Sequence, residues 1–70
     1  METFHLDGAP YIRLCDLLKT MGLCETGGHA KAEIAEGTVM VNGEIELRKR
    51  YKVTAGSEIL YGGVKLLVVD

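Results

Sequence analysis

Residues 26–47 read TGGHAKAEIAEGTVMVNGEIEL, and the order of local signals in this stretch decides the fold. Thr26 is a suitable N-cap for a short helix over residues 27–36. Gly37 is a typical residue for ending that helix, because glycine adopts the left-handed conformation without steric cost. From residue 38 onwards the chain has the pattern of β-strands. The stretch therefore predicts a helix that leads directly into a sheet.

A β-hairpin is predicted after this helix. Residues 38–41 and 45–47 are strand-like segments on either side of Asn42-Gly43. An Asn-Gly pair between apolar segments is a strong signal for a tight hairpin turn, because both residues tolerate positive φ. The two segments are therefore expected to pair in an antiparallel fashion.

The register of this hairpin can be argued from the side chains that share a face. A two-residue loop would place Val41 opposite Glu44 and so mix apolar and acidic side chains on one face. A bulge or an odd-length loop would place Val41 opposite Ile45. The same register would place Val39 opposite Leu47 and give a continuous apolar face. We predict this second register.

A helix is also predicted before the quoted stretch, over residues 11–21. Pro10 suits its first position and Gly22 ends it. Its apolar side chains recur at helical spacing and form one stripe, which comprises Leu14, Leu17, Leu18 and Met21.

Short strands account for much of the remaining chain: residues 2–6, 51–53, 58–61 and 64–69. The last strand is apolar enough to be either central in its sheet or well covered by other elements. The sequence therefore predicts an α+β fold, with two short helices packed on a small, mostly antiparallel sheet of four to five strands. No linker or repeat interrupts it, so we expect residues 1–70 to form a single domain.

Chain length and composition argue against an enzyme. The chain has 70 residues, 47% of them hydrophobic, and a formal net charge of −2. A chain this short buries only about 60% of the surface that its unfolded form exposes, which leaves little room for a deep active-site cleft. The sequence contains no serine–histidine–acid set and no Walker phosphate loop. We therefore expect a non-catalytic protein.

The two cysteines are expected to be reduced and to pack as small apolar residues. Cys15 and Cys24, even together with His5 and His29, lack the spacing of a zinc site, so no metal or cofactor is predicted. The first ten residues lack the basic start and apolar run of a signal peptide. No window approaches the roughly 20 apolar residues of a membrane span. We expect a cytoplasmic monomer that does not bind membranes.

Half of the basic residues are concentrated in one short segment, at Arg48, Lys49, Arg50 and Lys52. If this segment is a strand, alternation places Arg48, Arg50 and Lys52 on one face and Lys49 and Tyr51 on the other. Three cations on one face repel each other unless an anion binds between them. A basic run taken alone is more often a solvated hairpin edge that prevents aggregation. Tyr51 either stacks on a base or fills the core.

The start of the helix over residues 27–36 is a second candidate site. Gly27 and Gly28 have no side chains, so a phosphate can approach the free backbone N–H groups there. Lys31 lies one turn further on and points back toward the same end. The ordinary alternatives are a loop that gives way to a helix and a solvated lysine.

Three further residues complete the candidate surface. His29 lies in the first turn of the second helix. A histidine there can contact a phosphate, but it more often faces solvent. Lys19 and Lys65 are candidate extensions of the basic surface. These residues indicate a nucleic-acid ligand only when they are considered together.

Several short motifs of this chain occur together in one known family: RL at residues 13–14, GL at 22–23, AK at 30–31, GTVMVNG at 37–43 and YKV at 51–53. Together they resemble the S-four (S4) RNA-binding domain. The resemblance covers about residues 11–61, and GTVMVNG after a short helix is its most specific part. The segment ETGGHAK at residues 25–31 is similar to that of the small standalone YbcJ-like proteins of bacteria.

The resemblance implies RNA as the partner, bound by the second helix and the hairpin that follows. Lys31 matches a basic position of the family on that helix. The basic residues of the segment 48–52 match positions where family members carry cations that contact the RNA backbone. Gly27 departs from the arginine that the family commonly has there.

We therefore predict binding to the phosphate backbone of structured RNA, with ribosomal RNA as one candidate. The serious alternative is a protein-interaction module that uses the same surface, which the slight acidity of the chain favours.

Overall fold

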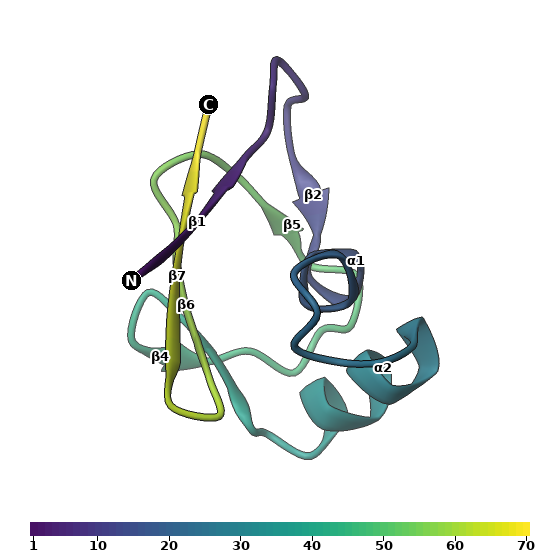
Figure 1. The fold of residues 1–70 in the computed structure, drawn as a ribbon. Helices are drawn as coiled ribbons and strands as arrows, with labels where there is room; N and C mark the ends of the chain where they lie inside the picture. Colours follow the sequence, from purple (N-terminus) through teal and green to yellow (C-terminus); the bar gives the residue numbers. More distant parts are fainter.

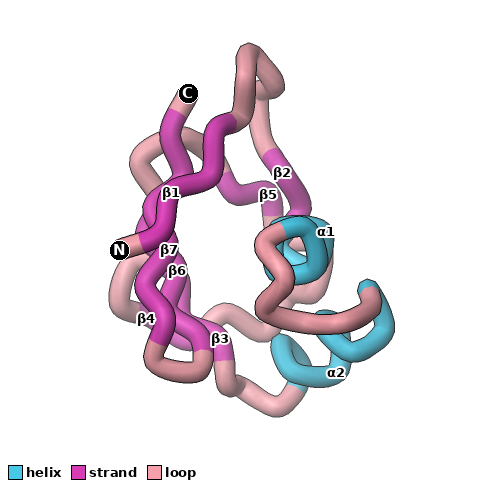
Figure 2. The backbone as a smooth tube through the Cα atoms, viewed as in Figure 1, coloured by secondary structure: helices cyan, strands magenta, loops and turns pink.

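The computed structural model describes all residues 1–70, and its elements form two layers (Figure 1). In chain order these are β1 (Glu2–His5), β2 (Ile12–Arg13), α1 (Leu14–Thr20), α2 (Gly27–Ala35), β3 (Val39–Val41), β4 (Glu44–Ile45), β5 (Lys52–Val53), β6 (Glu58–Tyr61) and β7 (Val64–Val69). The main sheet has five strands in the order β1-β7-β6-β3-β4, and β2 pairs with β5 in a second, two-stranded sheet. Figure 2 shows both helices on the same side of the main sheet. The predicted α+β class is confirmed.

The main sheet is antiparallel except where β1 pairs with β7. The strand β7 lies between β1 and β6, so of the two placements predicted for residues 64–69 the central one is confirmed. Gly62 and Gly63 connect β6 to β7 with φ values of 57° and 80°, which only glycine adopts readily.

The core lies between the helices and the inner face of the main sheet. Its completely buried side chains include the α1 stripe at Leu14, Leu17 and Leu18, together with Ile34 of α2 and Leu66 of β7. Burial of each such side chain stabilises the fold by about 1.5–3 kcal/mol. The helical spacing of apolar residues in the sequence thus correctly predicted which side chains of α1 are buried in the core.

The first helix begins three residues later than its pattern predicts. The predicted helix covers residues 11–21, whereas α1 begins at Leu14 and Ile12–Arg13 is the strand β2. Arg13 is extended, with φ −69° and ψ 141°, because it pairs with Lys52 of β5. Tertiary pairing therefore overrides the signal of Pro10, which is not in the helix.

The second helix forms as predicted, apart from its last residue. The Thr26 side chain accepts a hydrogen bond from the His29 backbone N–H at 3.0 Å, which caps α2. Gly37 follows the helix with φ 79°. Neither helix is long and apolar enough to cross a membrane.

The predicted hairpin is present, but the predicted register is wrong. Val41 pairs with Glu44 and Met40 with Ile45, so the loop contains only two residues. Asn42 and Gly43 have φ values of 51° and 84°, and this pair of positive values produces a tight two-residue turn.

The apolar argument for the other register fails because β4 is a short edge strand. Ile45 and Leu47 are 60% and 59% exposed, so neither needs an apolar partner across the hairpin. The side-chain Oδ1 of Asn42 also accepts a hydrogen bond from the Glu58 backbone N–H at 2.9 Å, which ties the turn to β6.

A polar contact joins α2 to the sheet. The Tyr61 hydroxyl donates a 2.8 Å hydrogen bond to the Glu33 carboxylate in a half-buried position. This bond is the main cause of a raised pKa for Tyr61, because the carboxylate disfavours loss of the phenolic proton.

We predict that Tyr61→Phe lowers the free energy of unfolding by about 1 kcal/mol at pH 7, because the charged acceptor loses its donor. A pKa raised in the folded state stabilises the protein below the unfolded pKa of about 10 and loses this effect as pH rises further. The difference between wild type and Tyr61→Phe should therefore shrink above pH ~10. Urea unfolding at several pH values measures it. Tyr11→Phe is the control, and an equal effect there would contradict the prediction.

Candidate nucleic-acid interface

The basic segment forms a loop and not a strand. Residues 46–51 connect β4 to β5, and we call residues 47–51 the basic loop. The Tyr51 N–H donates to the Arg48 carbonyl at 3.2 Å, which closes a turn. The predicted alternation of side chains along this segment is therefore wrong, since strand geometry begins only at Lys52.

Hydrogen bonds to α1 explain why the basic loop leaves the sheet. The Leu14 N–H donates to the Tyr51 carbonyl at 2.9 Å, and the Cys15 N–H donates to the Lys49 carbonyl at 3.1 Å. The first amides of a helix have no partner within the helix, so outside acceptors stabilise them. Arg13, the N-cap residue, makes no side-chain cap. The loop backbone thus caps α1, and α1 holds the loop.

Two open concavities lie along the basic loop. One of about 500 Å³ is lined by Arg48, Arg50, Tyr51 and Lys52. The other, of about 550 Å³, is lined by Lys31, Leu47, Lys49 and Arg50. Arg50 is common to both, so they adjoin. The structure therefore brings Lys31 of α2 together with the basic loop, as the sequence predicts.

The cations of this surface are mostly free of carboxylates. Of the eight basic residues in the chain, Arg13, Arg48 and Lys65 form ion pairs with acidic side chains. The remaining five are Lys19, Lys31, Lys49, Arg50 and Lys52, and all of these except Lys19 line the two concavities. Unpaired cations at one place form a surface that attracts anions, even on a chain of net negative charge.

Arg48 differs from these four because its guanidinium is already engaged. Its Nε and Nη2 donate to the two carboxylate oxygens of Glu46 at 2.9 and 3.0 Å. Hydrogen bonds from Arg48 are the main cause of a lowered pKa for Glu46. Arg48 thus offers little free charge to a phosphate.

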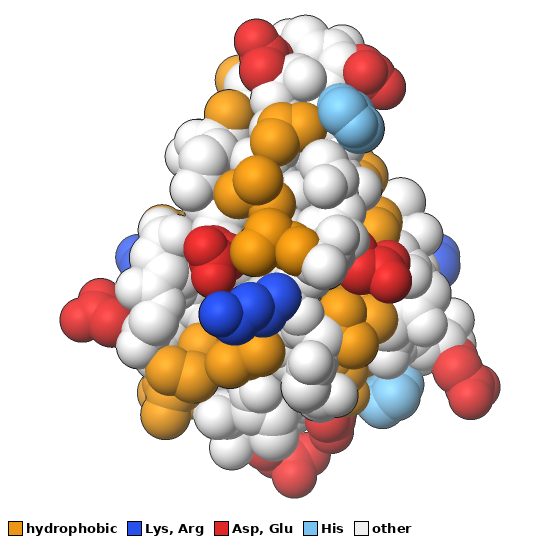
Figure 3. Space-filling view, turned by 60° about the vertical axis from the view of Figure 1, so that its left-hand side comes forward, with side chains coloured by type: hydrophobic (Ala, Val, Ile, Leu, Met, Phe, Trp, Pro, Cys, Tyr) orange, Lys and Arg blue, Asp and Glu red, His pale blue; other side chains and the backbone are white.

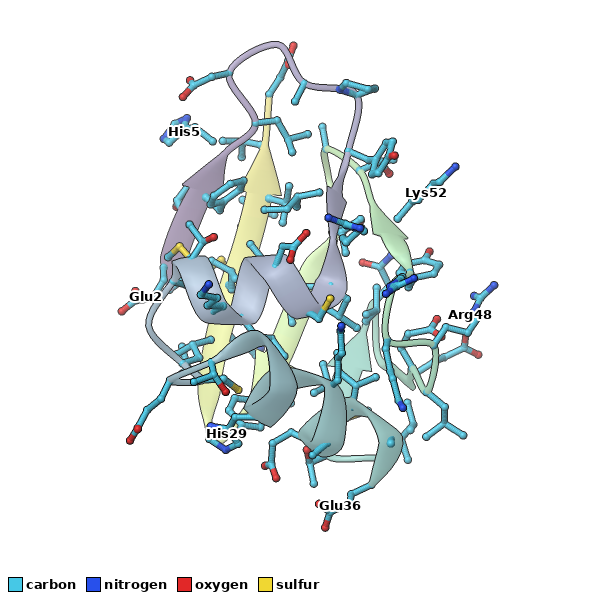
Figure 4. All side chains as sticks on the ribbon, turned by 90° about the vertical axis from the view of Figure 1, so that its right-hand side faces the viewer. Glu2, His5, His29, Glu36, Arg48 and Lys52 are labelled. Atoms are coloured by element: carbon cyan, nitrogen blue, oxygen red, sulfur yellow. The ribbon has the colours of Figure 1, made fainter.

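Two aromatic rings lie beneath cations at this surface. The Arg48 guanidinium carbon lies 4.7 Å from the centre of the Tyr51 ring. The Lys52 ammonium lies 5.1 Å from the centre of the Tyr11 ring. Both distances fall within the range of cation–π attraction. Figure 4 shows Arg48 and Lys52 projecting into solvent on the same side of the molecule.

The start of α2 is separate from the basic loop. Figure 4 shows His29 on the opposite side of the view from Arg48 and Lys52. His29 is exposed, and its Nδ1 accepts a hydrogen bond from the Glu25 N–H at 3.3 Å. Gly27 and Gly28 have no other side chain close to them, apart from the Thr26 hydroxyl near Gly28. The predicted site is therefore divided, because Lys31 lines a concavity at the basic loop and the other three residues line neither concavity.

The two predicted extensions also lie elsewhere. Lys19 is in the last turn of α1, whereas the basic loop contacts the first turn. Lys65 precedes buried Leu66 in β7 and so points to the outer face of the sheet, where it pairs with Glu58 at 3.8 Å. Figure 3 shows hydrophobic and acidic side chains on the sheet side of the molecule, and basic ones do not gather there.

The sequence interpretation missed three residues of this surface. Leu47 lines one concavity together with Lys31 and two loop cations. Glu46 holds Arg48, and Tyr11 lies beneath Lys52. The Glu-x-Arg spacing was the only available signal for the ion pair. The place of Tyr11 depends on the β2–β5 pairing, for which the sequence carries no local signal.

The cysteines fulfil their predicted role as apolar packers. Cys15 and Cys24 are free and buried, and burial raises the pKa of the Cys24 thiol. No group of three or more His, Cys, Asp or Glu side chains is arranged to hold a metal ion.

The chain is similar to one domain family, to two curated proteins and to one solved structure. The S4 domain family matches residues 4–69. The chain is 48% identical over 69 residues to the YbcJ proteins of Escherichia coli (strain K12) and Shigella flexneri, with 99% of each sequence covered. The name of the former proposes RNA binding. The solution structure of Escherichia coli YbcJ matches with a TM-score of 0.78 and 47% identity, over 100% of this chain and 89% of that one. It is described as containing an αL motif involved in RNA binding.

We predict that the pKa of Glu46 lies below the ordinary glutamate value, because hydrogen bonds from Arg48 stabilise the carboxylate. A lowered pKa stabilises the fold above the ordinary glutamate pKa of about 4.3 and loses this effect as pH falls through the lowered value. Carboxyl NMR titration measures the pKa of Glu46. Arg48→Ala should return Glu46 to the ordinary range, and an unchanged Glu46 pKa in that variant would contradict the prediction.

Proposed function

The chain belongs to the S4 domain family, and from this premise we propose that it is a non-catalytic protein that binds the phosphate backbone of structured RNA. Lys31, Lys49, Arg50 and Lys52 contact phosphates. The RNA lies across the basic loop and the adjacent face of α2. A ribosomal RNA is one candidate ligand within this class.

The observation that carries the proposal is the grouping of unpaired cations. Four of the five basic side chains without a carboxylate partner line two adjoining concavities. Without an anion, these like charges repel each other and weaken the fold, so their grouping is best explained by a polyanionic ligand. The relatives support the same interpretation through the RNA binding that their names propose.

The surface favours recognition by shape and charge. Its concavities are open, and its free donors sit on flexible lysines and one arginine. Such contacts position a nucleic acid backbone without reading its sequence. Proteins commonly recognise double-stranded RNA through backbone contacts and shape, so an RNA with helical segments is the expected ligand.

We predict that the protein binds an RNA hairpin with an affinity that falls steeply with salt, with a log–log slope of roughly −0.7 to −0.9 per phosphate contact. Lys31→Ala and Arg50→Ala should each weaken binding by about three- to tenfold and reduce the slope by about 1. Fluorescence anisotropy at several salt concentrations measures both quantities.

Lys65→Ala is the matched control, because it removes one positive charge from the opposite face of the sheet. Equal losses in Lys65→Ala and Arg50→Ala would mean that only net charge matters and would contradict the proposed surface. If the folded wild type fails to bind RNA at low salt, RNA binding itself is wrong. A protein-interaction module is then the better interpretation.

A further inference from the structure

Arg48 is the one cation of the basic loop that is held rigidly. Its guanidinium makes two hydrogen bonds to the Glu46 carboxylate, and its backbone N–H donates to the same carboxylate at 3.0 Å. These bonds neutralise the charge and occupy one edge of the guanidinium group. A phosphate would have to displace Glu46 to form the same paired contact. Arg48 is therefore poorly suited to the role that the lysines fill.

The faces of the guanidinium group remain available for a different contact. One face lies over the Tyr51 ring, 4.7 Å from its centre. Tyr51 packs against the hydrophobic core, and its carbonyl accepts the hydrogen bond from Leu14. The guanidinium plane of Arg48 therefore packs on a ring whose position is fixed by the core. The Arg48 side chain is nonetheless 74% exposed, which leaves its outer face open to solvent.

A planar group with an engaged edge and an open face is suited to stacking. Proteins that recognise unpaired RNA bases stack them on aromatic rings or on arginine guanidinium planes. The concavity beside Arg48 is open and has a volume of about 500 Å³, which leaves room for one nucleobase next to the guanidinium group. Arg50 and Lys52 line the same concavity and are free to meet the phosphates of the stacked nucleotide.

We propose that Arg48, clamped by Glu46 and supported by Tyr51, is a stacking platform for one unpaired nucleobase of the bound RNA. This inference rests on the proposed RNA binding and names the RNA class more closely. The ligand is a helical RNA interrupted by a bulge or a loop, and Glu46 is a positioning residue for the platform.

The experiment compares two RNA hairpins that differ at one place. The first carries a three-nucleotide purine bulge, and the second carries the same bulge with its bases removed, which leaves the phosphates unchanged. Wild-type protein should bind the purine bulge about tenfold more tightly, as expected for one stacked base. Arg48→Lys keeps the charge and removes the plane, so it should lose this preference but retain binding to the abasic RNA.

Two further variants separate stacking from charge and from folding. Lys49→Ala should weaken binding to both RNAs by the same factor, because it removes only a phosphate contact. Glu46→Gln should reduce the base preference without abolishing it, since an amide cannot accept both guanidinium bonds. Circular dichroism confirms that each variant is folded.

The outcomes distinguish this inference from the proposed function. Equal binding of both RNAs by the wild type, or an equal loss for both in Arg48→Lys, would overturn the stacking platform and leave RNA binding intact. Failure of the folded wild type to bind either RNA would overturn both.

Discussion

Two backbone hydrogen bonds join the start of α1 to the carbonyls of Lys49 and Tyr51. They satisfy helix amides that have no side-chain cap, and they also fix the path of the basic loop. The β2–β5 pairing brings the same two segments together just before α1 begins. Because the loop carbonyls face the helix, its long side chains are directed into solvent. The most buried helix of the fold and its most basic surface therefore depend on the same contact.

This arrangement explains how a chain with a net charge of −2 can present a cationic face. The sheet side carries Lys65 in a pair with Glu58, and Arg13 pairs with Asp16 at the start of α1. Where the loop and α2 meet, Lys31, Lys49 and Arg50 have no carboxylate partner. Exposed ion pairs contribute little to stability. Their main effect is on where free charge remains: apart from Lys19, every basic side chain without a carboxylate partner lies at this surface.

The sequence predicted those features that depend on neighbours along the chain. The Leu14–Leu18 stripe, the Thr26 cap and the Asn42-Gly43 turn are all local signals, and the structure contains each of them. Features set by distant contacts were predicted wrongly or missed. The pairing of Ile12–Arg13 with Lys52–Val53 shortened α1. The hydrogen bonds from the start of α1 to the carbonyls of Lys49 and Tyr51 hold the basic segment as a loop. The hairpin register failed for a related reason, since an edge strand does not need an apolar face.

A loop fixed by these hydrogen bonds can combine two kinds of contact, which differ in how much side-chain entropy is lost on binding. Lysines lose side-chain entropy when they bind phosphate, so they supply attraction at long range and little discrimination. A group that is ordered before binding loses less, and Arg48 is ordered by Glu46 and Tyr51 in the free protein. The ordering depends in turn on Tyr51 remaining against the core and bonded to Leu14. Recognition of a base by Arg48 therefore depends on the packing of Tyr51 against the core, whereas attraction of phosphates by the lysines does not. A core change near the start of α1 would thus impair recognition of a base before it impaired binding to the backbone.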